Sequence, residues 1–179
     1  MRAITLSPAK RIATAAITAV LLGGTPGLAT AATPQTALPT QLTADWYRLR
    51  IYPNNTPARQ LGVDSSGKVV VSVVDPENQR QQWSLSGTGS RQLIKNRATG
   101  TCLTAPSDTL DPVTLQTCDK NNTHQQWDLH YVTSTQLQVS PRNHLSLALT
   151  GGAQAGSNRA VLRDYAAQAN QQWAFRPVK

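Results

Sequence analysis

The tripeptide Gln-Gln-Trp occurs three times in this chain, and it constrains the fold more strongly than any other feature. The copies are Gln81-Gln82-Trp83, Gln125-Gln126-Trp127 and Gln171-Gln172-Trp173. Their tryptophans are 44 and 46 residues apart. A near-constant spacing of this length is typical of proteins built from structural repeats. The chain is therefore expected to contain three equivalent units, and its function has to be argued from them.

The repeated tryptophans are candidates for a shared core. The chain has four Trp, four Tyr and one Phe, and Trp83, Trp127 and Trp173 use three of these at equivalent positions. A common core requires large apolar side chains at repeated positions. In an extended segment, the Gln two places before each Trp points to the same side, and its amide can both donate and accept hydrogen bonds. Gln81 and its equivalents are predicted to fix the turn before each strand; the open alternative is contact with a ligand.

The N-terminus has the pattern of a secretory signal. Residues 1–31 combine basic residues, a short apolar run over 12–22 and a small-x-small site at Ala29-Thr30-Ala31. The run is too short to span a membrane. We expect cleavage near Ala31, secretion, a flexible lead-in over 32–44 and one domain over 45–179.

The basic excess of the chain is modest and dispersed. Seventeen Lys and Arg face nine Asp and Glu, and the predicted leader removes three of the basic residues. The remaining ones stand singly along the sequence, as at Arg48, Arg59, Lys68 and Arg80. A nucleic-acid footprint is usually a run or stripe of such residues. The sequence therefore favours solvated surface charge over a nucleic-acid partner, and it indicates no membrane partner.

Two cysteines, Cys102 and Cys118, are the only ones in the chain. In an exported protein an even pair is most simply a disulfide. On the chain-entropy estimate such a bond stabilises the fold by about 3 kcal/mol. No CxxC motif and no ligand set with metal-type spacing accompanies the pair. We expect no metal and no cofactor.

Short β-type segments separated by turn residues recur between the Gln-Gln-Trp copies. Each unit contributes three such segments before its copy, and the copy itself begins a fourth. No segment after the leader has a helical period. This pattern predicts an all-β domain of twelve short strands, with repeats at about 45–87, 88–132 and 133–179. The predicted strands before the copies are 46–51, 60–63, 68–74, 92–94, 102–104, 113–117, 136–139, 146–149 and 160–163.

Two stretches carry a family resemblance. Gly100-Thr101-Cys102-Leu103 with Gln125-Gln126-Trp127, and Leu145–Gly152 with Ala169–Trp173, resemble subdomains of the ricin B-type (R-type) lectin family. The resemblance covers essentially the whole domain. It implies a β-trefoil, in which three four-stranded repeats form a six-stranded barrel capped by three hairpins with pseudo-threefold symmetry.

The same resemblance implies where sugar sites would lie. Family members typically use an Asp on the second strand, an aromatic platform before the second Cys position, and an Asn beside the Q-x-W Gln. The Asp carboxylate accepts hydrogen bonds from sugar hydroxyls, the aromatic ring packs on the sugar ring, and the Asn amide hydrogen-bonds a further hydroxyl. Only Asn170 matches. In repeat order, the Asp positions are Gly62, Thr104 and Ala148; the platforms are Ser72 or Val73, Gln116 or Thr117, and Arg163; and the Asn positions are Arg80, His124 and Asn170.

The resulting hypothesis is a secreted, non-enzymatic carbohydrate-binding module with degenerate sites, whose partner is a polymeric or cell-surface glycan. The third repeat is the best candidate site and the second comes next. A sugar site predicts an exposed ring of Tyr47, Tyr52, Tyr131 or Tyr165 beside a carboxylate. The candidate residues are Asp164, Asn170 and Gln171 in the third repeat, and Thr104, His124 and Gln125 in the second.

The residues also bear on two other functions, catalysis and protein binding. Catalysis finds little support, because His124, His130 and His144 lie in no nucleophile or metal motif and no carboxylate pair has acid–base spacing. A secreted trefoil that has lost sugar binding, and acts as a protein-interaction or inhibitor scaffold, is the alternative. It explains the missing Asp and aromatic residues of the sugar sites directly.

Overall fold

The computed structural model describes residues 42, 44–51, 58–89, 91–109, 111–152 and 158–179. These residues belong to one unit, Leu38–Lys179. The predicted leader over 1–31 and nearly all of the lead-in over 32–44 lie outside the described residues. None of the described helices is long and apolar enough to cross a membrane.

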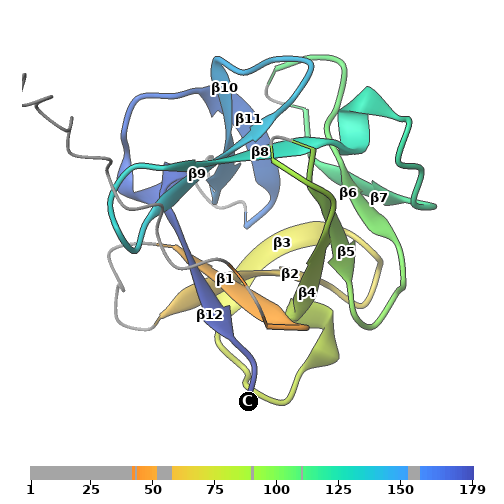
Figure 1. Ribbon diagram of the computed structural model, residues 1–179. Helices are drawn as coiled ribbons and strands as arrows, with labels where there is room; N and C mark the ends of the chain where they lie inside the picture. Colours follow the sequence, from red (N-terminus) through yellow and green to blue (C-terminus); the bar gives the residue numbers. More distant parts are fainter. Residues whose placement is uncertain (1–41, 43, 52–57, 90, 110, 153–157) are drawn as a thin grey trace, which may run out of the picture. The chain divides into compact units, whose positions relative to one another are not determined.

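The described residues form twelve strands and three short 3₁₀ turns (Figure 1). The turns are η1 (Gln79–Gln81), η2 (Thr123–Gln125) and η3 (Ala169–Gln171). The strands are β1 (Tyr47–Ile51), β2 (Arg59–Val63), β3 (Val69–Val73), β4 (Trp83–Ser86), β5 (Leu93–Asn96), β6 (Cys102–Thr104), β7 (Thr114–Gln116), β8 (Trp127–Tyr131), β9 (Leu137–Pro141), β10 (Leu147–Gly151), β11 (Ala160–Asp164) and β12 (Trp173–Pro177).

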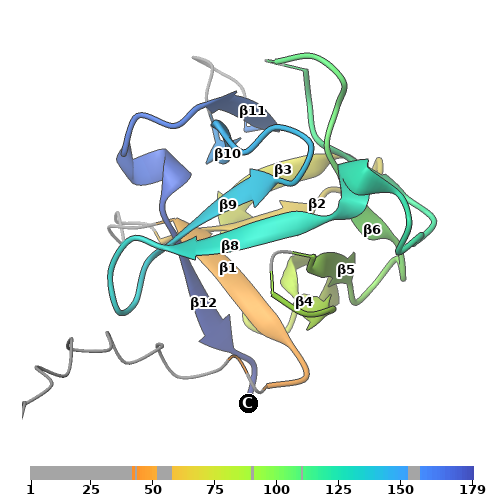
Figure 2. The same ribbon diagram turned by 45° about the horizontal axis from the view of Figure 1, so that its top comes forward.

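Six of the strands close into a ring. β12 pairs with β1, β1 with β4, β4 with β5, β8 with β9, and β9 with β12. Reciprocal backbone hydrogen bonds between Gln92 and Trp127 join the β5 and β8 segments and complete the ring. Ring closure leaves no free edge among these strands, which protects them from pairing with other chains. Figure 2 shows β1, β8, β9 and β12 along the side of this barrel.

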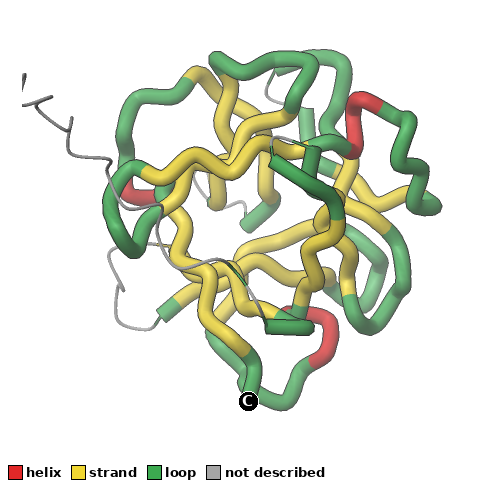
Figure 3. The backbone as a smooth tube through the Cα atoms, in the orientation of Figure 1, coloured by secondary structure: helices red, strands yellow, loops and turns green. Residues whose placement is uncertain are grey.

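The other six strands form three hairpins, β2–β3, β6–β7 and β10–β11. Each hairpin is followed by a 3₁₀ turn, and Figure 3 shows the three turns (red) at separate positions around the barrel. Three hairpins on a six-stranded barrel are the β-trefoil that the family resemblance implies. The all-β prediction is confirmed, and the β6 bounds match the predicted ones.

Two strands run two residues beyond their predicted ends, because cross-strand pairing continues there. β9 reaches Pro141, which pairs with Trp127, and β10 reaches Gly151, which pairs with Ala160. A Cβ atom on Gly151 would lie 2.7 Å from a Val71 methyl and 2.8 Å from an Ile51 methyl. Gly151 therefore permits β10 to pack closely against Val71 of β3 and Ile51 of β1.

The three repeated tryptophans are fully buried in one continuous hydrophobic core. Each indole Nε1 donates to a leucine carbonyl on the second strand of its own repeat, so the buried N–H group keeps a partner. The pairs are Trp83 with Leu61 at 3.1 Å, Trp127 with Leu103 at 2.9 Å, and Trp173 with Leu149 at 2.9 Å.

Candidate functional site

The first Gln of each Gln-Gln-Trp copy is buried and makes the same two backbone contacts in every repeat. Its Nε2 donates to a carbonyl at the end of the third strand, and its Oε1 accepts from the amide two residues later. The triplets are Gln81 with Val73 and Asp75, Gln125 with Thr117 and Asp119, and Gln171 with Asp164 and Ala166. These amides hold the loop before each 3₁₀ turn.

The second Gln of each copy fastens the same loop from another direction. Its Nε2 donates to the carbonyl of Pro76, Lys120 or Ala167. Each loop is therefore held by two side-chain amides. The repeated glutamines make most of their hydrogen bonds to the protein's own backbone. This matters for function, because a fully bonded amide has little capacity left for a sugar hydroxyl.

The tryptophan bonds also fix which residues are equivalent on the second strands. The residue after the accepting leucine is Gly62, Thr104 or Thr150. The third Asp position of the family pattern is therefore Thr150. The assignment of this position to Ala148 from the sequence is wrong by two residues. The repeats differ in the lengths of their loops, so the sequence alone does not give the register of β10. Thr104 and Thr150 are buried, and each hydroxyl donates to the carbonyl two residues earlier.

The residues at the family's Asn position also bond within their own repeats. Asn170 Nδ2 donates to the Gly151 carbonyl at 3.2 Å, and His124 Nδ1 lies 3.2 Å from the Ala105 carbonyl. Arg80 reaches the Asp64 carbonyl at 3.1 Å. All three side chains bind the end of the second strand, so this position has a structural role throughout.

The first repeat leaves little room at its equivalent site. A Cβ atom on Gly62 would lie 2.9 Å from Gln81 Cγ, and Gln81 also accepts from Gln60 and donates to Ser72. The neighbouring Asp64 carboxylate is used in its own turn, where it accepts from the Lys68 amide at 2.9 Å. This hydrogen bond, with those from the Ser66 hydroxyl and amide, holds the pKa of Asp64 below its usual value.

The third repeat has an open hollow at the corresponding place. Its volume is about 320 Å³. Asp164 is exposed, and neither its carboxylate nor the Arg163 guanidinium has a hydrogen-bond or ion-pair partner among the described residues. Arg163 Nε is buried without a partner. The lining residues are Thr109, Arg163, Asp164, Ala166, Gln168 and Gln171.

The candidate residues of the third repeat divide between two hollows. Asp164 and Gln171 line the one just described, whereas Asn170 lines another of about 360 Å³ with Arg59, Val71 and the glycines at 151–152. Arg163 and Gln168 join the first hollow and were not singled out as binding residues from the sequence. In the sequence, Arg163 was noted only because it occupies the platform position, where the family has an aromatic residue.

The candidate residues of the second repeat all make hydrogen bonds within that repeat. Thr104 and Gln125 are buried, and half-buried His124 also lies 3.4 Å from the Asn143 amide. Cys102 and Cys118 form a disulfide across the same hairpin, with an S–S distance of 2.00 Å. The described residues contain no group of three or more His, Cys, Asp or Glu that could hold a metal ion.

The aromatic side chains do not gather at the third-repeat hollow. Tyr47 is buried, Tyr131 packs against the core, and Tyr165 is half-buried. Tyr52 lies outside the described residues. No described residue that lines the third-repeat hollow is aromatic. Half-buried Trp46 instead lines a separate hollow.

Comparison with known proteins decides the family. The model of the ricin-type β-trefoil lectin domain matches residues 51–177. The chain belongs to this lectin family. No curated protein matches it significantly. The assignment of this ricin-type lectin domain therefore rests on the family model.

Solved structures show the same fold at low identity. The designed threefold protein ThreeFoil is 21% identical with a TM-score of 0.62, covering 74% of this chain and 98% of ThreeFoil. The ricin B-like lectin of Macrolepiota procera, solved in complex with lactose, is 11% identical with a TM-score of 0.62, covering 77% and 99%. An endo-β-galactosidase from Clostridium perfringens is 18% identical with a TM-score of 0.63; the match covers 75% of this chain and only 32% of the enzyme.

Proposed function

We propose that this chain is a secreted, non-enzymatic carbohydrate-binding module whose working site is the hollow of the third repeat. The family match supports carbohydrate binding in general. The observation that supports the third repeat is a pair of polar groups, the Asp164 carboxylate and the Arg163 guanidinium, which line one hollow and have no hydrogen-bond or ion-pair partner among the residues that the structure describes. A carboxylate that accepts from hydroxyls and a guanidinium that donates to ring oxygens are suitable sugar contacts.

The first two repeats are degenerate in their sugar sites. The groups that could meet a sugar there already bond within the protein, as Arg80 does with the Asp64 carbonyl and His124 with the Ala105 carbonyl. A single open site without an aromatic platform is expected to bind a monosaccharide weakly. Useful affinity would then come from a polymeric or clustered glycan that several molecules can engage.

One observation favours the alternative, a trefoil that presents its loops to a protein. The described lining of the third-repeat hollow has no aromatic residue, and sugar sites usually combine polar groups with a ring. The alternative predicts that the folded protein binds no glycan, and that a substitution in a loop abolishes binding of a protein partner.

The test is a glycan array of the purified chain, followed by calorimetric titration of any ligand found. β-Galactosides are the first choice, because the Macrolepiota procera lectin was solved with lactose. Asp164→Asn and Arg163→Gln should each weaken binding by at least ~10-fold, since each removes a charge-assisted hydrogen bond.

Glu77→Gln is the matched control. Glu77 is exposed in the corresponding loop of the first repeat, and its change should leave glycan affinity unaltered. A blank array from a folded protein would reject the lectin proposal in favour of a protein partner. Binding that survives both third-repeat substitutions would place the site elsewhere.

A further inference from the structure

The outer side of β1 and β12 carries arginines that lie far apart in the sequence. Along β1 the alternating residues Tyr47, Leu49 and Ile51 are buried, so Arg48 and Arg50 point outward. The register of the β1–β12 ladder sets Arg48 directly opposite Arg176. Residues opposite each other in such a ladder point to the same side of the sheet, so three guanidinium groups share this face.

These arginines lack negatively charged partners within the described part of the chain. Arg48 makes one hydrogen bond, from NH2 to the Pro177 carbonyl, at a long 3.4 Å. The Nε atoms of Arg48 and Arg50 are buried and have no partner. Like charges directly opposite on neighbouring strands are destabilising. The pair Arg48 and Arg176 therefore leaves positive charge on this face that no described residue neutralises.

The face continues past the start of β1 into a hollow of about 420 Å³. The Val178 amide donates to the Trp46 carbonyl at 2.9 Å, which prolongs the ladder and places Trp46 on the same side as Arg48. The Arg97 guanidinium lies over the Trp46 ring, 5.1 Å from its centroid. Asp45 is the one carboxylate side chain among the described residues that line the hollow.

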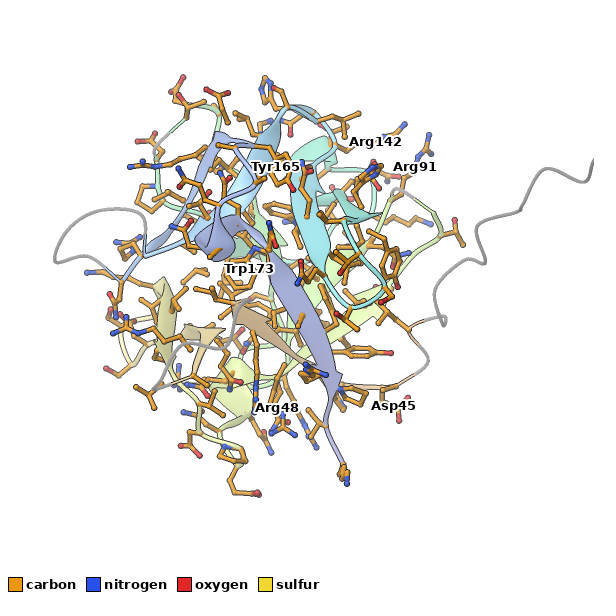
Figure 4. All side chains as sticks on the ribbon, turned by 90° about the vertical axis from the view of Figure 1, so that its left-hand side faces the viewer. Asp45, Arg48, Arg91, Arg142, Tyr165 and Trp173 are labelled. Atoms are coloured by element: carbon orange, nitrogen blue, oxygen red, sulfur yellow. A yellow bond between two sulfur atoms is a disulfide. The ribbon has the colours of Figure 1, made fainter. Side chains whose placement is uncertain are left out.

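We call the surface formed by Trp46, Arg48, Arg50, Arg97 and Arg176 the β1–β12 basic face. Its members come from both ends and the middle of the domain, which explains why the basic residues look dispersed in the sequence. Figure 4 shows Arg48 and Asp45 at one end of the domain, and Arg91 and Arg142 at the opposite end.

We propose that the β1–β12 basic face is a second binding site, specific for an anionic polysaccharide that carries sulfate or carboxylate groups. Guanidinium groups bind both of these anions through paired hydrogen bonds. The remaining surface of the Trp46 ring in the hollow suits the C–H face of a sugar. From Arg50 to Trp46 the face spans roughly 13 Å at the rise of a β-strand, which is long enough for more than one sugar unit. The site does not depend on the third-repeat hollow.

The test compares the affinities of the purified chain for heparin, polygalacturonate, a neutral galactan and a short DNA duplex in the same buffer. Heparin and polygalacturonate separate sulfate from carboxylate recognition, and DNA tests a nucleic-acid partner. Arg48→Gln with Arg176→Gln should weaken binding of the preferred anionic polysaccharide by at least ~10-fold. The matched control, Arg91→Gln with Lys120→Gln, removes the same charge from exposed positions elsewhere and should change affinity less than about 2-fold.

Three results would overturn the proposal. The first is an equal loss in both double variants, because that would mean that net charge alone attracts the polymer. The second is DNA binding as tight as polysaccharide binding, with the same dependence on Arg48 and Arg176. The third is no binding of either anionic polysaccharide by the folded chain. Asp164→Asn should leave binding at the basic face unchanged, so failure here and failure of the third-repeat site remain distinguishable.

Discussion

In the first repeat two side chains cap the loop before the Gln-Gln-Trp copy, whereas the equivalent loop of the third repeat has neither. Asp75 accepts from the Glu77 amide at 3.2 Å and Asn78 accepts from the Arg80 amide at 3.0 Å. In the third repeat these positions are Ala166 and Gln168, and the Gln168 side chain makes no cap. Turns of this kind depend on short Asp and Asn side chains.

The third-repeat loop instead turns through Ala167, whose φ is +53°, a conformation that non-glycine residues rarely adopt. Gln168 is left to line the hollow. The comparison shows that the repeats share one core and differ in how their loops are fastened. A site in this fold can therefore open through the loss of local hydrogen bonds, without any change in the barrel.

The largest predicted effect tests whether the cores are equivalent. Trp83→Ala and Trp173→Ala should each lower the free energy of unfolding by about 3–5 kcal/mol, because each removes a fully buried side chain. Chemical denaturation measures both. Leu145→Ala is the control, since Leu145 is 57% exposed and its change should cost under about 0.5 kcal/mol. If either tryptophan variant loses less than about 1 kcal/mol, that tryptophan is not a core residue and the repeats do not share one core.

The second repeat differs from the other two in having a disulfide, so reduction should affect stability through that repeat. Cys102 and Cys118 are 16 residues apart, and loss of their bond should lower stability by about 3 kcal/mol. The measurement is the unfolding transition of the protein with and without reductant, with Cys102→Ala/Cys118→Ala as a second form. An unchanged melting temperature would show that the loop is already fully held by Gln125 and Gln126.

The buried glutamines should be equivalent in stability and different in function. Gln81→Ala and Gln171→Ala each leave a carbonyl and an amide without their partners, which should cost about 1–3 kcal/mol. Only Gln171→Ala should also weaken glycan binding, because it loosens the loop beside the hollow. Equal losses of glycan binding in the two variants would contradict the difference between the repeats.

Backbone strain in the third-repeat loop gives a smaller effect of opposite sign. Ala167→Gly should raise stability by up to about 1 kcal/mol, since glycine adopts a positive φ without a steric penalty. Thermal unfolding would show this as a higher melting temperature. A decrease would mean that this loop does not hold Ala167 in the left-handed conformation in solution.

The smallest effect is a pH dependence that arises at Asp64 in the first repeat. Hydrogen bonding, chiefly from the Lys68 amide, lowers the pKa of folded Asp64. Its contribution is therefore present above the unfolded value of about 3.9 and is lost as pH falls through the lower folded value. Asp64→Asn should reduce stability at neutral pH and flatten the acid side of the stability profile. Parallel acid profiles for the unchanged chain and Asp64→Asn would contradict the role of this turn.

The fold was largely predictable, because the Gln-Gln-Trp copies carry the parts of the pattern that the barrel repeats. Their spacing predicted three four-stranded units, and their family resemblance predicted the β-trefoil. The register of the second strands was less accessible. Thr150 could be assigned only once Trp173 was seen to donate to the Leu149 carbonyl, because the repeats differ in loop length.

The candidate sites were less predictable for a physical reason. A Gln or His beside a Q-x-W motif has the same sequence whether its side chain bonds to a neighbouring carbonyl, as His124 does, or faces solvent. The basic face also depends on distant pairing, since Arg48 and Arg176 meet only through the β1–β12 ladder. Such features require the register, which no local pattern supplies.

The most direct test of the difference between the first and third repeats is an NMR titration with lactose or the best ligand from the glycan array, read at the backbone amides. The account predicts ligand-dependent shifts at Asp164, Ala166 and Gln168 and none at the equivalent positions of the first repeat. Shifts centred on Gly62 and Asp64, or equal shifts in all three repeats, would contradict it.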